Sequence, residues 1–420
     1  MKYGLIAQKL SHSFSKEIHG KLFDYEYTLQ EIPPEELDAF MRCREFAAIN
    51  VTIPYKEAVI PYLDEISDTA RNIGAVNTIV NKDGRLIGYN TDFSGMVALI
   101  RQVGIVLKDK KVLVLGSGGT SKTAMAVARH LQCREVYRVS RSGREDCITY
   151  QQAAKCHSDA QILINTTPCG MYPNLDKSAV EAADYPALEG VVDAVYNPLC
   201  SKLVCDALER GIPAVGGLYM LVAQAVYAAE KFVDKTVPEE KIQEVYRQMM
   251  AQKQNIVLIG MPGCGKTTAG KALAQALGAD FIDTDQEIVE QDGRTIPQIF
   301  QQEGEQGFRD LETAAIARVA ARQHAVIATG GGAVLRKENM HLLRQNGRIY
   351  FIDRSLDMLE TTPDRPLSCN RQDLERRYRE RYDIYLASCH RHIPGDSAIE
   401  HVVQVIKEDF ENENFGDQRT

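Results

Sequence analysis

The chain has 420 residues, which at roughly 150 residues per domain predicts two or three domains. Its 44% hydrophobic and 25% charged residues exclude a disordered chain, a fibre and a small disulfide scaffold. The net charge of −8 argues against a primary nucleic-acid binder, because such proteins usually carry a basic surface.

The start of the chain has no long apolar core of a secretory signal, and no stretch approaches the roughly 18 apolar residues of a spanning helix. Ten cysteines are scattered without a C-x-x-C pair, which favours reduced thiols and predicts no structural metal site. We therefore expect a cytoplasmic protein that binds small molecules and neither nucleic acid nor a membrane. The oligomeric state stays open.

The predicted elements indicate an α/β fold in several parts. Strands and helices alternate over residues 1–103, which predicts an N-terminal α/β domain. A strand, a glycine turn and a helix over 111–131 open a Rossmann-like nucleotide domain at 104–217. Helices at 218–234 and 236–250, the second starting at Thr236, complete the first domain, and 251–254 form a short connection. A second strand–glycine–helix unit at 255–277 opens a P-loop domain with a parallel sheet at 254–410, followed by a polar tail, 411–420.

Residues 260–267 match the pattern G-x-x-x-x-G-K-[ST] in full, between a strand and a helix. In such loops backbone N–H groups surround phosphate oxygens, the lysine reaches the β- and γ-phosphates, and the hydroxyl ligates Mg²⁺. The alternative is a structural glycine turn. We expect ATP with Mg²⁺, Lys266 as a catalytic residue, Thr267 as a metal ligand, and loop contacts from Gly263, Cys264, Gly265, Lys266, Thr267 and Thr268.

Asp283 and Asp285 follow the next apolar stretch. Two carboxylates that are two residues apart on an extended segment point the same way. One could support the metal and the other could orient or deprotonate an alcohol; the alternative is a solvated helix N-cap. Residues 330–332 are three glycines at a strand end, which allow a ligand close to the backbone or form a plain turn.

With Phe308-Arg309-x-x-Glu312, Arg365-Pro366-Leu367 and Arg381 four residues before Tyr385, nearly all of 254–410 resembles shikimate kinase. The resemblance implies that Asp285, Arg309, Gly331 and Arg381 bind shikimate and that Asp285 orients the attacking hydroxyl or accepts its proton. It also implies that Arg365 closes on the phosphates and that Asp283 supports Mg²⁺. The segment before Arg365 is shorter than the family's, and the usual R-x-P-L-Y reads R-Y-D-I-Y, which puts lid closure and ATP affinity in question.

In the first half, a glycine turn follows the strand KVLVL, with Ser121 in place of the usual third glycine. The next strand ends in serines and arginines, without the acid that binds the ribose of NAD. This favours a 2′-phosphate and therefore NADP, with a purely structural turn as the alternative. The expected cofactor residues are Gly116, Ser117, Gly118, Gly119, Thr120, Ser140, Arg141, Ser142 and Arg144.

Lys56 follows a strand end and Asp92 stands at a helix start. A lysine beside an aspartate can present a proton to a ketone oxygen as hydride arrives, whereas a lysine alone is more often a surface residue. Nine blocks, among them NVTIPYK, GAVNTI, GYNTD, INTTPCGM and GGLYMLVAQA, occur in order. Over 1–250 the chain therefore resembles shikimate dehydrogenase.

This second resemblance implies that 1–103, completed by 218–250, is the substrate-binding domain of the dehydrogenase. It also implies that Lys56 and Asp92 are the catalytic pair. It implies substrate contacts by Ser13, Ser15, Thr52, Asn77, Asp92, Tyr196 and Gln224, and cofactor contacts by Asp68, Ala194 and Gly217. The residue after Asp92 is Phe93 where the family has glycine, and we expect it to narrow the mouth of the substrate site.

Together the two halves predict a bifunctional shikimate-pathway enzyme. The first half reduces 3-dehydroshikimate to shikimate with NADPH, and the second phosphorylates shikimate with MgATP. Two alternatives remain at this stage: a dehydrogenase with a degenerate, nucleotide-binding kinase-like module, and a first half that also accepts quinate.

Overall fold

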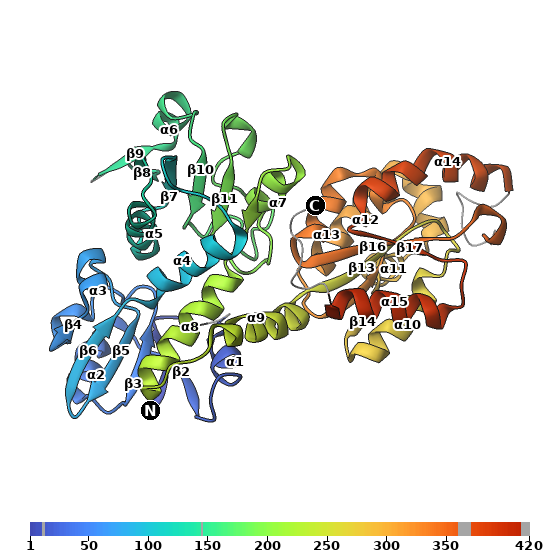
Figure 1. Cartoon of the computed structure of the whole chain (residues 1–420). Helices are drawn as coiled ribbons and strands as arrows, with labels where there is room; N and C mark the ends of the chain where they lie inside the picture. Colours follow the sequence, from blue (N-terminus) through green and yellow to red (C-terminus); the bar gives the residue numbers. More distant parts are fainter. Residues whose placement is uncertain (11–12, 144–145, 360–370, 413–420) are drawn as a thin grey trace. The chain divides into compact units, whose positions relative to one another are not determined.

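The computed structural model describes residues 1–10, 13–143, 146–359 and 371–412. The chain divides into two compact units, Met1–Met249 and Met250–Thr420. Each unit combines helices with mostly parallel sheets (Figure 1), which confirms the predicted α/β fold class. Among the described residues, no helix combines the length and apolarity needed to cross a membrane.

The first sheet is mixed, with the order β2-β1-β3-β5-β6-β4. β5 is antiparallel to both β3 and β6, so β3 and β6 run in the same direction. Their carboxyl ends therefore meet at one edge, beside the start of β5. The elements here are β1 Tyr3–Ala7, α1 Ser15–His19, β2 Tyr27–Glu31, α2 Leu37–Cys43, β3 Ala48–Val51, β4 Glu65–Ile66, α3 Asp68–Ile73, β5 Thr78–Lys82 and β6 Arg85–Tyr89.

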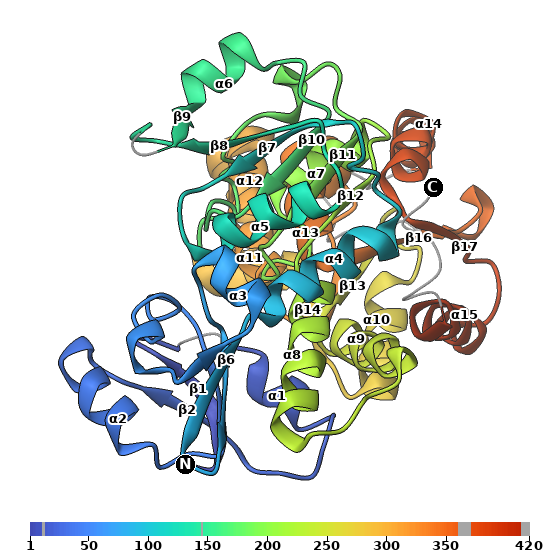
Figure 2. The same ribbon diagram turned by 60° about the vertical axis from the view of Figure 1, so that its left-hand side comes forward.

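The second sheet is fully parallel, with the order β12-β11-β10-β7-β8-β9. Every residue of β7 is buried, as expected for a central parallel strand covered on both faces. Figure 2 shows helices on both sides of this sheet. The elements are β7 Lys111–Leu115, α5 Gly119–His130, β8 Glu135–Ser140, β9 Cys147–Thr149, α6 Tyr150–Cys156, β10 Ile162–Asn165, β11 Gly190–Asp193, α7 Lys202–Glu209 and β12 Ala214–Val215.

The remaining helices of this part of the chain are α4 Thr91–Val103, α8 Leu218–Val233 and α9 Glu239–Lys253. The predicted 218–234 matches α8 to within one residue, whereas α9 differs from the predicted 236–250 at both ends. The expected helix start at Thr236 is wrong, because Val237 N–H donates to Glu230 Oε1 (2.8 Å) and the helix begins only after Pro238. The expected connection at 251–254 is also wrong. Ala, Gln and Lys are strong helix formers, so α9 continues through Lys253 and only Gln254 separates it from the next strand.

The third sheet is again fully parallel, with the order β14-β15-β13-β16-β17. Its central strand β13 leads directly into the glycine-rich loop, and α12 is broken at Gly304, where φ is 72°. The elements are β13 Asn255–Ile259, α10 Lys266–Leu277, β14 Asp280–Asp283, α11 Thr284–Asp292, α12 Ile296–Ala320, β15 Ala325–Ala328, α13 Lys337–Asn346, β16 Gly347–Asp353, α14 Arg371–Ser388, β17 Arg391–Pro394 and α15 Ile399–Asn412.

The close packing of α4 on α8 yields a stability prediction. A methyl group on Gly95 would lie 2.8 Å from the Met220 carbonyl oxygen and 3.0 Å from Gln224 Cβ, so Gly95→Ala must push the helices apart. We expect a loss of about 1–3 kcal/mol of unfolding free energy, measured by urea unfolding followed by circular dichroism. Ser94→Ala, at an exposed position of the same helix, is the control and should change stability by less than about 0.5 kcal/mol. Equal stabilities of the two variants would contradict this packing argument.

Two candidate active sites

Lys56 and Asp92 form a largely buried ion pair. Lys56 Nζ lies 2.6 Å from Asp92 Oδ2, and the two side chains are only 13% and 10% exposed. Lys56 follows β3 and Asp92 follows β6, and these strands end at the same edge of the first sheet. The topology therefore joins two residues that are 36 positions apart in sequence.

The start of α4, which carries Asp92, is held by a polar network that sequence reasoning only partly identified. Asn90 caps α4 by accepting from Phe93 N–H (3.1 Å). Asn77 Oδ1 accepts from Thr91 N–H (2.7 Å), and its amide nitrogen lies 3.5 Å from Gln224 Oε1 on α8. Asn77 and Gln224 were predicted, whereas Asn90 and Thr91 lie inside the quoted block GYNTD without an assigned role. Their position at a helix start was the available signal.

The two serines at the start of the chain lie together. Ser15 N–H donates to Ser13 Oγ (3.2 Å), and Ser15 is buried. The Tyr196 ring packs on Phe14 between them in sequence, with ring centroids 5.2 Å apart. Thr52 stands at the end of β3, where its N–H donates to the Ile6 carbonyl (3.1 Å).

The predicted dinucleotide turn passes directly beside Lys56. Gly116 has a φ of 119°, and a β-carbon there would lie 2.6 Å from Thr166 Oγ1. A β-carbon on Gly119 would contact Lys56 Cδ at 3.7 Å. Ser121, which replaces the third glycine, is buried and donates to the Gly118 carbonyl (2.6 Å). The turn also contains Ser117 and Thr120. It lies close to the Lys56 side chain because its glycines have no side chains that would separate the two.

The end of β8 carries the residues predicted to select NADP. Ser140 Oγ accepts from Gly143 N–H (3.2 Å), while Arg141 and Ser142 are exposed. The nearby acid Asp146 forms an ion pair with Arg138. Arg144 lies outside the described residues.

The remaining predicted cofactor residues differ in their settings. Gly217 N–H donates to the Val195 carbonyl (2.7 Å), and a β-carbon on Gly217 would overlap Ala194, so these segments touch. The Asp68 side chain is 94% exposed and lies 3.4 Å from Arg71. The structure therefore supports the placement of Gly217 and Ala194 together, and it shows Asp68 in an ion pair on α3.

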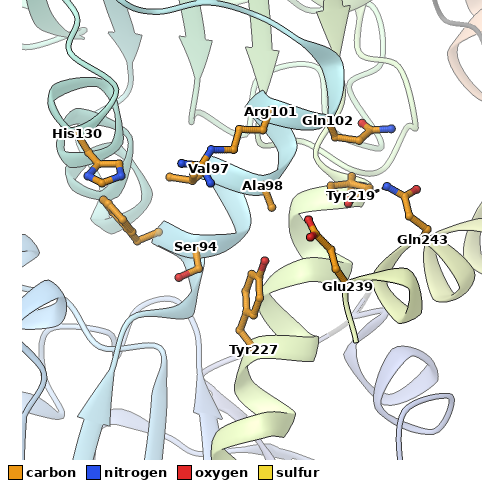
Figure 3. Close-up of a pocket in the computed structure, with 11 residues that line it drawn as sticks. Ser94, Val97, Ala98, Arg101, Gln102, His130, Tyr219, Tyr227, Glu239 and Gln243 are labelled. Atoms are coloured by element: carbon orange, nitrogen blue, oxygen red, sulfur yellow. Dashed lines mark hydrogen bonds between the residues drawn. The ribbon is translucent and has the colours of Figure 1, made fainter. Parts of the chain in front are cut away.

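A cavity of about 490 Å³ lies on another flank of α4 (Figure 3). Phe93 lines it and packs edge-on against His130, the last residue of α5, with centroids 5.3 Å apart. The expectation that Phe93 narrows the mouth of the substrate site stays a prediction, and its ring packs at the opposite end of α5 from Gly119. About two turns along α4 from Phe93, Arg101 lines the same cavity with Tyr227 and Glu239 from α8 and the start of α9.

In the second unit, the glycine-rich loop has the backbone that its motif requires. Gly260, Gly263 and Gly265 have φ values of 147°, 85° and 98°, a region that favours glycine. Lys266 Nζ is buried and donates to the carbonyls of Gly260 (2.8 Å) and Met261 (3.0 Å). The ammonium group therefore lies inside the loop.

Asp283 and Asp285 do not share an extended segment, which corrects the prediction. β14 ends at Asp283 and α11 begins at Thr284, because Asp283 Oδ1 caps the helix by accepting from Asp285 N–H (3.0 Å). The other oxygen of Asp283 accepts from Thr267 Oγ1 (2.9 Å). A hydroxyl and a carboxylate thus face each other beside the glycine-rich loop, and these hard oxygen donors fit Mg²⁺.

Asp285 has a perturbed carboxyl group. Burial raises its pKa to about 6, with further contributions from the charges of Asp283 and Glu312. Asp285 Oδ1 is shielded from solvent and has no hydrogen-bond partner among the described residues. Its pKa and free oxygen suit a group that accepts a proton from a ligand.

The three glycines 330–332 are the meeting point of the predicted substrate residues. A β-carbon on Gly330 would lie 2.6 Å from Asp285 Oδ1, and one on Gly332 would collide with the Arg309 guanidinium. The Gly331 carbonyl accepts from Arg381 Nη1 (3.0 Å). Arg309 also donates to Glu312 (2.8 Å), a fully buried residue whose role sequence reasoning left unassigned. Arg365 lies outside the described residues.

Comparisons with known proteins match both units. Residues 5–79 match the family model of the shikimate dehydrogenase substrate binding domain, and residues 262–411 match the model of shikimate kinase. The shikimate dehydrogenase (NADP(+)) of Clostridium perfringens is 36% identical over 265 residues, which cover 58% of this chain and 97% of the relative. That of Geobacillus kaustophilus is 37% identical over 252 residues, 55% of this chain and 91% of the relative.

Solved structures agree. Shikimate dehydrogenase 1 from Peptoclostridium difficile is 33% identical with a TM-score of 0.55, covering 59% of this chain and 98% of that one. The Thermus thermophilus enzyme, solved with NADP(H) and shikimate, is 27% identical with a TM-score of 0.54, covering 59% of this chain and 99% of that one. With this coverage and the match at 262–411, the chain belongs to the shikimate dehydrogenase family and carries a domain of the shikimate kinase family after the dehydrogenase part.

Proposed function

We propose that this chain is a bifunctional enzyme that catalyses two consecutive steps. The first unit reduces 3-dehydroshikimate to shikimate with NADPH, and the second phosphorylates shikimate with MgATP. The observation that carries the proposal is the presence of two built sites on one chain: the buried Lys56–Asp92 pair beside a dinucleotide turn, and Asp285 beside the glycine triplet and the phosphate loop. Reduction creates the C3 hydroxyl that the kinase then uses as its nucleophile.

In the dehydrogenase site, Lys56 and Asp92 act on the carbonyl oxygen. NADPH, when bound, supplies a hydride that adds to C3. The Lys56 ammonium gives a proton to the C3 oxygen, and Asp92 at 2.6 Å stabilises and orients that ammonium. Ser13 and Ser15 hold the substrate carboxylate, and Tyr196 borders the ring beside Phe14.

The remaining dehydrogenase residues orient substrate and cofactor. Thr52, Asn77 and Gln224 bind ring hydroxyls, supported by the hydrogen-bond network that joins Asn77 to α4 and α8. The turn from Gly116 to Thr120 approaches the pyrophosphate, and Ser140, Arg141 and Ser142 hold the 2′-phosphate, because they supply donors and positive charge without a carboxylate.

In the kinase site, Asp285 accepts the proton of the C3 hydroxyl as the oxygen attacks the γ-phosphorus and the bond to ADP breaks. Lys266 and the N–H groups of the loop hold the phosphates, and Thr267 and Asp283 hold Mg²⁺, which neutralises phosphate charge when bound. Arg309, Arg381 and Gly331 orient shikimate, the two arginines by pairing with its carboxylate.

The central test is one coupled assay on the purified chain with 3-dehydroshikimate, NADPH and MgATP, following NADPH loss and ADP formation together. Wild type should consume both. Lys56→Ala should stop both signals, with the reduction slowed about 10²–10⁴-fold, whereas Lys266→Ala should stop only ADP formation.

Lys122→Ala is the control for the dehydrogenase, since Lys122 forms a neighbouring but more exposed pair with Glu57. NADPH loss without shikimate-dependent ADP would refute the kinase assignment and favour a module that only binds nucleotide. The reverse reaction tests the substrate range of the first unit. If the chain oxidises quinate as fast as it oxidises shikimate, that range includes quinate.

Cofactor choice is tested at the end of β8. Arg141→Ala should raise the KM for NADPH about tenfold and leave the KM for NADH within twofold, because only NADPH carries the 2′-phosphate. Initial rates with each cofactor measure the ratio. An equal effect on both cofactors would show that Arg141 does not bind the 2′-phosphate.

The pKa of Asp285 predicts the pH dependence of the kinase. Because the active form is the carboxylate, kcat/KM for shikimate should rise with pH below about 6 and level off above it. Asp285→Asn should lower the rate about 10²–10⁴-fold. It should also raise stability at pH 7, since burial disfavours the charged form and that cost appears as pH rises through the raised pKa. A rate independent of pH between 5 and 7 would contradict the assignment.

A further inference from the structure

Tyr385 belongs to the arginine–tyrosine motif of the second unit, yet the proposed mechanism gives it no part. It lies on α14 and is fully buried. Its hydroxyl donates to the Gly331 carbonyl at 2.5 Å. Arg381 Nη1 donates to the same oxygen at 3.0 Å. Two side chains of one helix therefore converge on one backbone atom of the predicted substrate site.

The sequence spacing explains this convergence. Residues four apart lie on one face of a helix, so Arg381 and Tyr385 point to the same place. A carbonyl oxygen has two lone pairs and can accept both bonds. A β-carbon on Gly331 would lie 2.7 Å from Pro262 Cδ, so the Gly331 backbone also packs closely on the phosphate loop. The Gly331 backbone thus has close neighbours both in α14 and in the phosphate loop.

Arg381 has two competing partners once substrate arrives. A carboxylate is a stronger acceptor for a guanidinium than a neutral carbonyl, so we expect a bound shikimate carboxylate to draw the Nη1 donor of Arg381 away from Gly331. If Arg381 were its only partner, the Gly331 carbonyl would then lose its hydrogen bond in a partly buried site, which is costly.

We propose that Tyr385 is a positioning residue that keeps the Gly331 carbonyl hydrogen-bonded while Arg381 transfers to the substrate carboxylate. The proposal rests on the proposed kinase function. It explains why a tyrosine, Tyr385, stands four residues after Arg381. Tyr385 lowers the cost of binding shikimate and takes no part in phosphoryl transfer itself.

The setting of the ring allows the hydroxyl to be tested by itself. The Tyr385 ring stacks on Phe351, with centroids 5.0 Å apart and an interplanar angle of 17°. Burial raises the pKa of Tyr385 above its ordinary value, so the hydroxyl remains a donor throughout the working pH range. Phenylalanine keeps the stacked ring and removes only the donor.

The experiment measures steady-state ADP formation by the full chain with shikimate and MgATP. Tyr385→Phe should raise the KM for shikimate about tenfold while kcat and the KM for ATP stay within twofold. Tyr382→Phe is the matched control, since it removes a hydroxyl on the same helix that donates to Asp353 (3.0 Å) instead of Gly331. It should leave all three constants within twofold.

A double-mutant cycle separates this role from simple structural support. In an Arg381→Gln background the carboxylate no longer draws a guanidinium from Gly331, so adding Tyr385→Phe should lower kcat/KM for shikimate no further. The proposal would be overturned if Tyr385→Phe lowered kcat/KM for shikimate by the same factor in the Arg381→Gln background as in wild type. It would also be overturned if Tyr385→Phe alone left the KM for shikimate unchanged. If wild type forms no ADP with shikimate, the kinase function fails and the inference fails with it. If wild type forms ADP with shikimate and Tyr385→Phe has the same KM for shikimate, the kinase function stands and only this inference fails.

Discussion

Both sites depend on glycine backbones that neighbouring side chains approach more closely than a β-carbon would allow. Gly116 lies against Thr166 in the first unit, and Gly330 lies against Asp285 and Glu312 in the second. These glycines follow the carboxyl ends of parallel strands, where open α/β sheets bind their ligands. In the proposed functions, steric room at the strand ends brings the reactive side chains within reach of a substrate.

The two sites use opposite electrostatic arrangements for related tasks. In the first, a lysine and an aspartate form an ion pair of opposite charges, with Nζ and Oδ2 2.6 Å apart. In the second, neighbouring carboxylates and burial together raise the pKa of Asp285, while Arg309 is occupied by Glu312. The first pair is suited to giving a proton to a ketone oxygen, and the second group is suited to taking one from an alcohol.

Sequence reasoning succeeded where a function needs a local pattern. The α/β class and the glycine loop around Lys266 were predictable because their strand–turn–helix context lies within a few residues. Sequence reasoning failed where one element joins the next. Asp283 caps α11, so Asp285 lies in that helix and not on the extended segment. Glu230 accepts a hydrogen bond from Val237 N–H, and α9 begins after this contact and not at Thr236. The contact between Lys56 and Asp92 arises from the strand order of a mixed sheet, which no local pattern contains.

The position of Lys266 has a consequence for how the phosphate loop discriminates among anions. With its ammonium group bonded to the carbonyls of Gly260 and Met261, the loop satisfies its own buried charge internally. An incoming anion must compete with these two carbonyls for the N–H donors of the ammonium group. A single weak anion offers few acceptors for that exchange, whereas a polyphosphate chain presents several oxygens at once to the lysine and the loop amides. We therefore expect the loop to favour polyphosphates over the common monovalent anions of the solution.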